Sequence, residues 1–155
     1  MKRNTFLFVM LFILGSSVFC QSFDLPNWIQ PGMSLENTIK ISKDLNIYLY
    51  EGSSNSRFNT YLFVSNNIIY IMLFSIYDNN IYGVQISSSS NVNENFLNAL
   101  SNLTTRYGSH DEIFNGKHLW MVESFNHLYD ANVWLSIEII DNVEYVLIEY
   151  GFSRK

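Results

Sequence analysis

The sequence is poor in the residue types that several common functions need. Its single cysteine, Cys20, leaves the folded part without a disulfide or a pair of thiolates for metal binding. The seven glycines are scattered singly, which argues against a glycine-rich phosphate-binding loop. Basic residues number 9 against 14 acidic ones. Because nucleic-acid affinity depends largely on counterion release by basic groups, this balance argues against a nucleic-acid partner.

Aromatic residues, in contrast, are abundant. The first twenty residues hold two basic and no acidic side chains, so the other 135 of 155 carry a formal net charge of −7, with 8 Phe, 10 Tyr and 3 Trp. That content supplies enough apolar surface to offset chain entropy, and it argues against disorder. The length suits one domain rather than two.

The N-terminal segment is typical of an export signal. Lys2 and Arg3 precede an apolar run over residues 5–14, which is shorter than the roughly 20 apolar residues of a membrane span. We therefore expect residues 1–20 to be a signal peptide. The protein is then exported, and is periplasmic, secreted or anchored in the cell envelope.

Two processing routes remain open at the end of this segment. Cleavage after Cys20 would make Gln21 the first residue of a mature chain without cysteine. Alternatively, Cys20 becomes a lipid-bearing first residue, with Leu14 and Ser17 upstream as in bacterial lipoproteins. Phe19 departs from that pattern, in which Gly, Ala or Ser precedes the cysteine. A lipid on Cys20 is the expected membrane contact in this second route.

Two segments have the periodicity of helices. Ser34 is a good N-cap for a short helix over residues 35–44. A longer helix is predicted over residues 93–107, where Gly108 follows the last turn.

Nearly everything else alternates with the period of a β-strand. Aromatic and β-branched runs, separated by turn-forming residues, predict strands at 47–50, 58–64, 68–76, 81–86, 118–124, 132–140 and 143–150. The serine-rich residues 87–91 have the composition of an internal linker.

This order of elements predicts a single α+β domain over residues 21–155. One half spans about residues 31–86 and the other about 92–151, joined by the linker at 87–91, and each runs from a helix into strands, as α-β-β-β repeated. Neither half can bury a sheet face alone. We therefore expect one antiparallel sheet with both helices packed on one face, which leaves the other face open.

The helix opening at residues 32–39, Gly-Met-Ser-Leu-Glu-Asn-Thr-Ile, resembles that of small bacterial exported proteins with the β-lactamase-inhibitor-protein-like fold. This group includes small lipoproteins of the outer-membrane barrel-assembly machinery. Residues 103–108, followed by a strand with Trp120, are similar to the second half of tandem members. The resemblance implies a repeated helix-plus-meander unit with a curved sheet, whose open face binds proteins or other envelope components. Residues 44–46 depart from the pattern, which has glycine and proline there.

The densest ionisable cluster is His110-Asp111-Glu112, in a predicted loop. Consecutive residues of an extended loop point to alternate sides, so at most His110 and Glu112 could share one metal ion. His118 and His127 lack the spacing of known metal sites. We favour solvated loop charges, and the alternative is a small exported metal-dependent hydrolase or small-ligand-binding protein that uses this loop.

The aromatic residues are the feature that points to binding. We expect several of them to share one side of the sheet, where Tyr and Trp offer large, rigid contact area. The alternative is that these rings close the core. The candidate binding residues are Trp120, Trp134, Tyr145, Tyr48 and Tyr50. The sequence thus predicts a non-enzymatic protein, with no cofactor, metal or catalytic residue, that binds another macromolecule, and an envelope protein is the expected partner.

Overall fold

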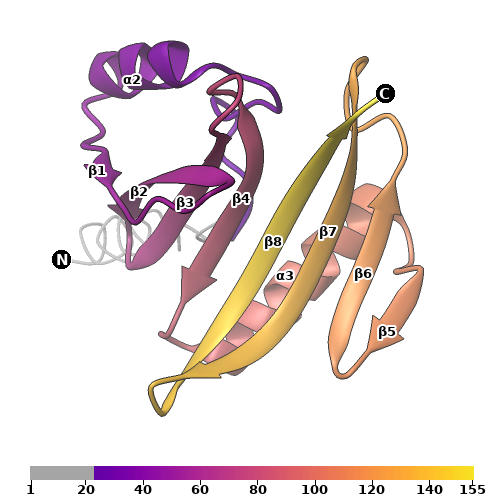
Figure 1. The fold of residues 1–155 in the computed structure, drawn as a ribbon. Helices are drawn as coiled ribbons and strands as arrows, with labels where there is room; N and C mark the ends of the chain where they lie inside the picture. Colours follow the sequence, from indigo (N-terminus) through magenta and orange to yellow (C-terminus); the bar gives the residue numbers. More distant parts are fainter. Residues whose placement is uncertain (1–22) are drawn as a thin grey trace, which may run out of the picture.

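The computed structural model describes residues 23–155, so the predicted signal peptide, Cys20 and Gln21 lie outside the described residues. Eight strands of the described part form one sheet in the order β1-β2-β3-β4-β8-β7-β6-β5 (Figure 1). Every neighbouring pair is antiparallel. The predicted α+β class with an antiparallel sheet is confirmed. No helix within residues 23–155 is both long and apolar enough for a membrane span.

Each half of the chain is a helix followed by four strands. The first half contains α2 (Leu35–Asp44), β1 (Tyr50–Glu51), β2 (Phe58–Ser65), β3 (Ile68–Ser75) and β4 (Ile81–Ser88). The second half contains α3 (Val92–Tyr107), β5 (Glu112–Phe114), β6 (Lys117–Val122), β7 (Tyr129–Ile140) and β8 (Val143–Arg154). The last strands of the two halves, β4 and β8, pair at the centre of the sheet.

Two of the differences from the sequence prediction come from strand pairing. Ser87 and Ser88, expected in the linker, belong to β4 because the long strand β8 offers them ladder partners. Glu112, expected in a loop, opens the short strand β5. A two-residue turn with positive φ at Asn115 and Gly116 joins β5 to β6, which is the backbone geometry that favours a tight hairpin.

The α3 helix covers one face of the sheet. It packs against β7 and β8, and Figure 1 shows it behind these strands. Val133, Leu135 and Ile148 are fully buried on this face, where Ala99 and Leu103 of α3 are buried as well. Side chains of successive strand residues point to opposite faces, so the alternate residues of β7 and β8 lie on the uncovered face. We call this uncovered side the open face.

The α2 helix contributes less to the core than α3 does. Its buried residues, Thr38 and Ser42, are small and polar, and its contacts with the strands are sparse. Phe23, Leu25 and Ile29 of the preceding segment are buried in the core. The predicted arrangement with both helices packed on one face is therefore not confirmed for α2.

One carboxylate ties this N-terminal segment to the second half. Asp24 Oδ1 accepts hydrogen bonds from Tyr150 Oη at 3.1 Å and from Arg106 Nη1 at 3.0 Å. Asp24 Oδ2 lies 2.7 Å from Arg106 Nη2. Burial, with the nearby charge of Asp24, raises the pKa of Tyr150 well above its ordinary value. Asp24 thus links the segment before α2 to both α3 and β8.

We expect Asp24→Ala to lower the free energy of unfolding by about 1–3 kcal/mol, because it leaves the buried Tyr150 hydroxyl without an acceptor. Arg106→Gln is the matched control. It should cost less than about 1 kcal/mol, since the Arg106 side chain is half exposed and its ion pair is screened by solvent. Urea unfolding of both variants measures the difference. Equal losses in the two variants would show that the Tyr150 hydrogen bond contributes nothing.

Candidate functional site

A row with two adjacent glycines crosses the centre of the open face. Cross-strand pairing aligns Leu73, Gly83, Gly151 and Asn132 over β3, β4, β8 and β7. Two glycines are therefore paired directly where the halves of the chain meet. The space above Gly151 is free of neighbours, whereas the Leu73 side chain lies against Gly83.

The next row along the strands carries the polar groups of the site. Gln85, Glu149 and Trp134 are aligned on β4, β8 and β7. Gln85 Nε2 donates to Glu149 Oε1 at 2.7 Å, and both side chains are half-buried. Glu149 and Trp134 are direct cross-strand partners, so the carboxylate lies beside the indole.

A bulge in β4 supplies the opposite wall. The pairing of β3 with β4 shifts register between Leu73 and Phe74, which leaves Tyr82 as an extra residue in β4. A bulge of this kind changes the direction of a side chain. Tyr82 is 51% exposed and stacks on Phe58 of β2, with ring centroids 5.3 Å apart.

These rows enclose a hollow of about 350 Å³ on the open face. It is lined by Phe58, Leu73, Tyr82, Gly83, Gln85, Asn132, Trp134, Glu149, Tyr150 and Gly151, and we call it the junction hollow. Its volume lies at the lower end of the roughly 300–1,000 Å³ that is usual for ligand pockets. It therefore has room for one side chain or a small head group.

The two glycines of the junction hollow differ in whether a side chain would fit at their position. A Cβ at Gly83 would lie 2.9 Å from the backbone oxygen of Tyr150, so the close approach of β8 requires glycine there. A Cβ at Gly151 would meet nothing within 4 Å, and its φ lies outside the left-handed region. Glycine inside a strand costs stability relative to alanine. Gly151 therefore has no packing role, and its effect is to keep the hollow open.

The structure brings only part of the predicted binding set together. Trp134 lines the junction hollow, and Tyr145 stands on the same face, opposite Glu138. Trp120 is 1% exposed on the helix-covered face, and its Nε1 donates to the backbone oxygen of Gly108 at 3.0 Å. The prediction of Trp120 on the binding face is wrong because the strand register pairs it with Val133 of the core.

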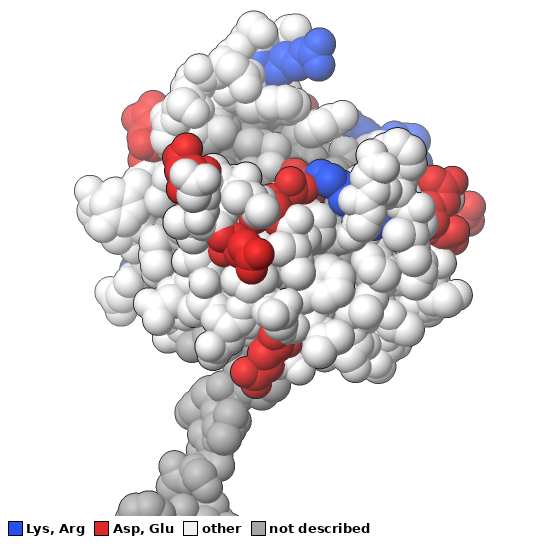
Figure 2. Space-filling view, turned by 90° about the horizontal axis from the view of Figure 1, so that it is seen from below, with Lys and Arg blue, Asp and Glu red and all other residues white. Residues whose placement is uncertain are grey.

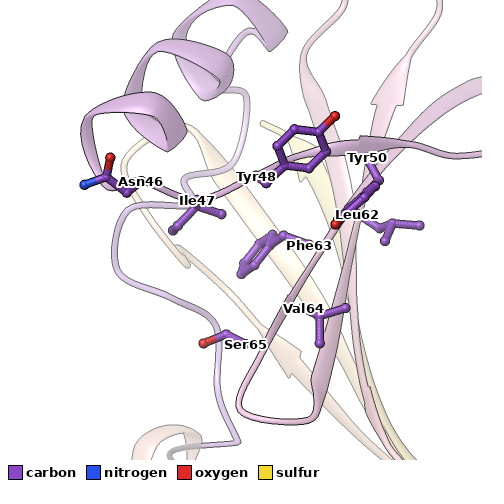
Figure 3. Close-up of a pocket in the computed structure, with 8 residues that line it drawn as sticks. All are labelled: Asn46, Ile47, Tyr48, Tyr50, Leu62, Phe63, Val64 and Ser65. Carbon is purple, nitrogen blue, oxygen red and sulfur yellow. The ribbon is translucent and has the colours of Figure 1, made fainter.

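Tyr48 and Tyr50 line a second hollow at the far edge of the sheet (Figure 3). Their ring centroids are 4.5 Å apart, and Tyr48 is 72% exposed and Tyr50 53% exposed. Tyr48 precedes β1 rather than lying in a strand. The pairing of β1 with β2 ends at Tyr50 and Leu62, so the segment with Tyr48 diverges from β2 beyond Leu62. The opening is about 570 Å³ and its other residues are Asn46, Ile47, Leu62, Phe63, Val64 and Ser65. Five strand spacings separate Tyr50 from Trp134, so the two hollows are distinct.

The loop of the alternative metal-binding hypothesis is divided between the two faces of the sheet. His110 packs against His118, with ring centroids 4.7 Å apart, on the helix-covered face. Asp111 Oδ2 accepts from the backbone N–H of Met121 at 2.7 Å, and Glu112 in β5 pairs with Leu119 on the open face. The prediction that His110 and Glu112 could share an ion is therefore wrong. Within residues 23–155, no three potential ligands come together as a metal site.

His118 is electrostatically unusual. Its Nδ1 is buried without a hydrogen-bond partner among the described residues, and its ring packs against Phe96 and Trp120. Burial, with a smaller effect of the nearby His110, lowers the pKa of His118 below 6.5. The neutral imidazole is therefore the favoured form in the folded protein.

Charges on the open face are unevenly paired. Lys117 forms an ion pair with Glu138. The hydrogen bond to Glu138 raises the pKa of Lys117, and the negative charge of Glu149 raises it further. The same hydrogen bond lowers the pKa of Glu138. Seen from below, the molecule is hollowed toward one margin, where acidic and basic side chains lie close together (Figure 2). Glu138 is thus paired with Lys117, and the Glu149 carboxylate near the junction hollow acts on the same ammonium group at longer range.

Most residues of the junction hollow are missed by reasoning from the sequence. Phe58, Tyr82 and Gln85 look like ordinary strand residues until the register is known. The available signals are Gly83, inside the predicted strand at 81–86, and Gly151, directly after the predicted strand at 143–150, because a glycine in a strand pattern indicates a bulge or a close approach.

Comparisons of this chain with protein families, curated proteins and solved structures gave no match. The resemblance to β-lactamase-inhibitor-like proteins therefore stays a prediction.

The two glycines should respond in opposite ways to alanine. We expect Gly151→Ala to raise the free energy of unfolding by about 0.5–1 kcal/mol, because alanine restricts the unfolded chain and meets no neighbour in the folded one. Gly83→Ala should lower it, because its Cβ would press on the Tyr150 backbone. Thermal or urea unfolding measures both changes. A clear loss of stability in Gly151→Ala would show that this glycine has a packing role after all.

His118 should make stability depend on pH in the weakly acidic range. Its folded pKa lies below 6.5, so the unfolded chain binds the proton more tightly and stability falls as the pH drops from 6.5 toward the folded pKa. Below the folded pKa this contribution levels off. We expect His118→Phe to remove this part of the pH dependence, as measured by urea unfolding at several pH values. An NMR titration that places the pKa of His118 at or above 6.5 would contradict the assignment.

Proposed function

We propose that the chain is an exported, non-enzymatic protein that binds another macromolecule through the open face of its sheet, with an envelope protein as partner. The observation that carries the proposal is the junction hollow. Trp134 and the Phe58–Tyr82 pair stand on either side of bare backbone at Gly151. Gly151 keeps this space open at a cost in strand stability, which favours a role in binding.

The size and composition of the site support a macromolecular partner. About 350 Å³ admits one anchoring side chain, which is how most binding energy is concentrated at protein interfaces. Trp and Tyr are the residues most enriched at such anchor points. Exposed apolar residues continue on the same face beyond the hollow, as at Met121. They would form the surrounding contact area.

The proposal includes the relation to β-lactamase-inhibitor-like exported proteins. A helix followed by four strands occurs twice, and the two halves meet in one antiparallel sheet, which supports a tandem origin. Phe23 is buried within a few residues of the expected processing site. In the lipid-anchored route, two residues would therefore separate Cys20 from the folded core.

We expect Trp134→Ala to lose the partner that the wild-type protein captures by cross-linking in envelope extracts of cells that produce it. Truncation removes one wall of the junction hollow, and a loss of tenfold or more in captured partner corresponds to an anchor contribution of at least about 1.4 kcal/mol. Leu97→Ala is the matched control, because Leu97 is a large exposed residue on α3, which packs on the other face. It should capture the partner as the wild type does.

Quantitative mass spectrometry of the captured proteins provides the comparison, with unfolding midpoints to verify that both variants are folded. Identical partner sets from the wild type, Trp134→Ala and Leu97→Ala would overturn the proposal. Loss of the same partner in Leu97→Ala alone would move the binding surface to the helix side.

A further inference from the structure

The floor of the junction hollow is rich in hydrogen-bond acceptors. Gln85 Nε2 donates to Glu149 Oε1. A carboxylate only accepts, so this bond turns the amide oxygen of Gln85 away from Glu149. Glu149 Oε2 and Gln85 Oε1 remain to accept from a ligand, and neither is a buried, unpartnered atom. The floor therefore suits a ligand that donates hydrogen bonds.

The same floor favours a cationic ligand. The ion pairs within residues 23–155 join Arg106 to Asp24, Lys117 to Glu138 and Lys155 to Asp130, so Glu149 forms no ion pair there and interacts with Lys117 only at longer range. The chain without its first twenty residues carries a net charge of −7. Long-range electrostatics thus attract a basic partner, and the Glu149 carboxylate provides a local counter-charge for it.

The walls favour a flat cation. Trp134 and the stacked Phe58–Tyr82 pair present aromatic surface on both sides of the hollow. A guanidinium group binds aromatic faces and at the same time donates from a planar fork to two acceptors. The ammonium group of lysine is compact and strongly hydrated, and it fits this combination less well.

We propose that the junction hollow receives an arginine side chain of the partner, whose guanidinium donates to Glu149 and Gln85 between Trp134 and Tyr82. This inference rests on the proposed function and names the chemistry of the partner, a protein that presents an exposed arginine. Gly151 determines specificity, because any side chain at this position would fill the space of the guanidinium.

The test uses the protein produced from the full sequence and two peptides. One is acetyl-Gly-Ser-Arg-Ser-Gly-amide, and the other replaces arginine by citrulline, which keeps the shape but lacks the charge. NMR spectra follow the Trp134 indole N–H and the Gly151 amide during titration. We expect the arginine peptide to shift both signals, with affinity roughly tenfold or more above that of the citrulline peptide, and to weaken as salt is raised.

Two variants examine the assigned contacts. Gly151→Val fills the hollow in a space that is free of neighbours, and Glu149→Gln keeps the volume but removes the charge. Each should reduce affinity for the arginine peptide roughly tenfold or more, which is the range for a charge-assisted hydrogen bond. Leu97→Ala, on α3 at the helix-covered side, should retain wild-type affinity. The NMR spectra also show whether each variant is folded.

Several outcomes would overturn the proposal. These are equal affinity for the two peptides, unchanged affinity in Gly151→Val, equal or larger shifts of the same signals by the neutral sugar maltotriose, and shifts caused by raising the protein concentration alone. The last outcome would assign the hollow to a second copy of the chain.

If the envelope partner is lost in Trp134→Ala but the wild type does not bind the arginine peptide, macromolecular binding stands and the arginine assignment fails. If both tests are negative, both proposals fail.

Discussion

The pairing of β4 with β8 is the constraint on which the rest of the molecule depends. It joins the two helix-and-strand halves into one sheet and fixes which residues face α3. Because side chains alternate with period two, a slip of one residue would bring Ile148 to the open face and bury Glu149 against the helix. The fully buried Ile86 and Ile148, which are direct partners, hold this register. The core and the candidate binding site are therefore determined by the same set of backbone hydrogen bonds.

The open face is built from features that a packed core excludes. A bulge directs Tyr82 outward, a glycine leaves space above β8, and the Glu149 carboxylate stands beside the Trp134 indole. The glycine lowers strand stability relative to alanine, and bulges are over-represented where a side chain is redirected toward a site. The convergence of these features at the junction of the halves distinguishes this region from the second hollow beside Tyr48, whose residues are mostly aromatic and aliphatic. The helix-covered side, held by the fully buried layer and by Asp24, supplies the stability that lets the open face depart from good packing.

Local patterns predict the elements well, because they are local in origin. The N-cap at Ser34 and the apolar spacing that leads to Gly108 predict both helices to within one residue. Alternation predicts most strands and separates Trp134 from the core residue Val133. Alternation does not show which strands are neighbours or which side of a strand faces the core, so the prediction for Trp120 is wrong. The β4 partner of Gly151, Gly83, lies more than sixty positions earlier in the chain, and no local pattern relates the two.

The edges of the sheet have a consequence of their own. The outermost strands, β1 and β5, are two and three residues long, so each end of the sheet offers little backbone for another strand to pair with. Short edges are one way in which β-proteins avoid joining edge to edge into polymers. This matters in a chain that exposes Ile113, Phe114 and Ile139. The molecule can therefore present apolar surface to a partner while its outermost strands offer only short templates for strand addition.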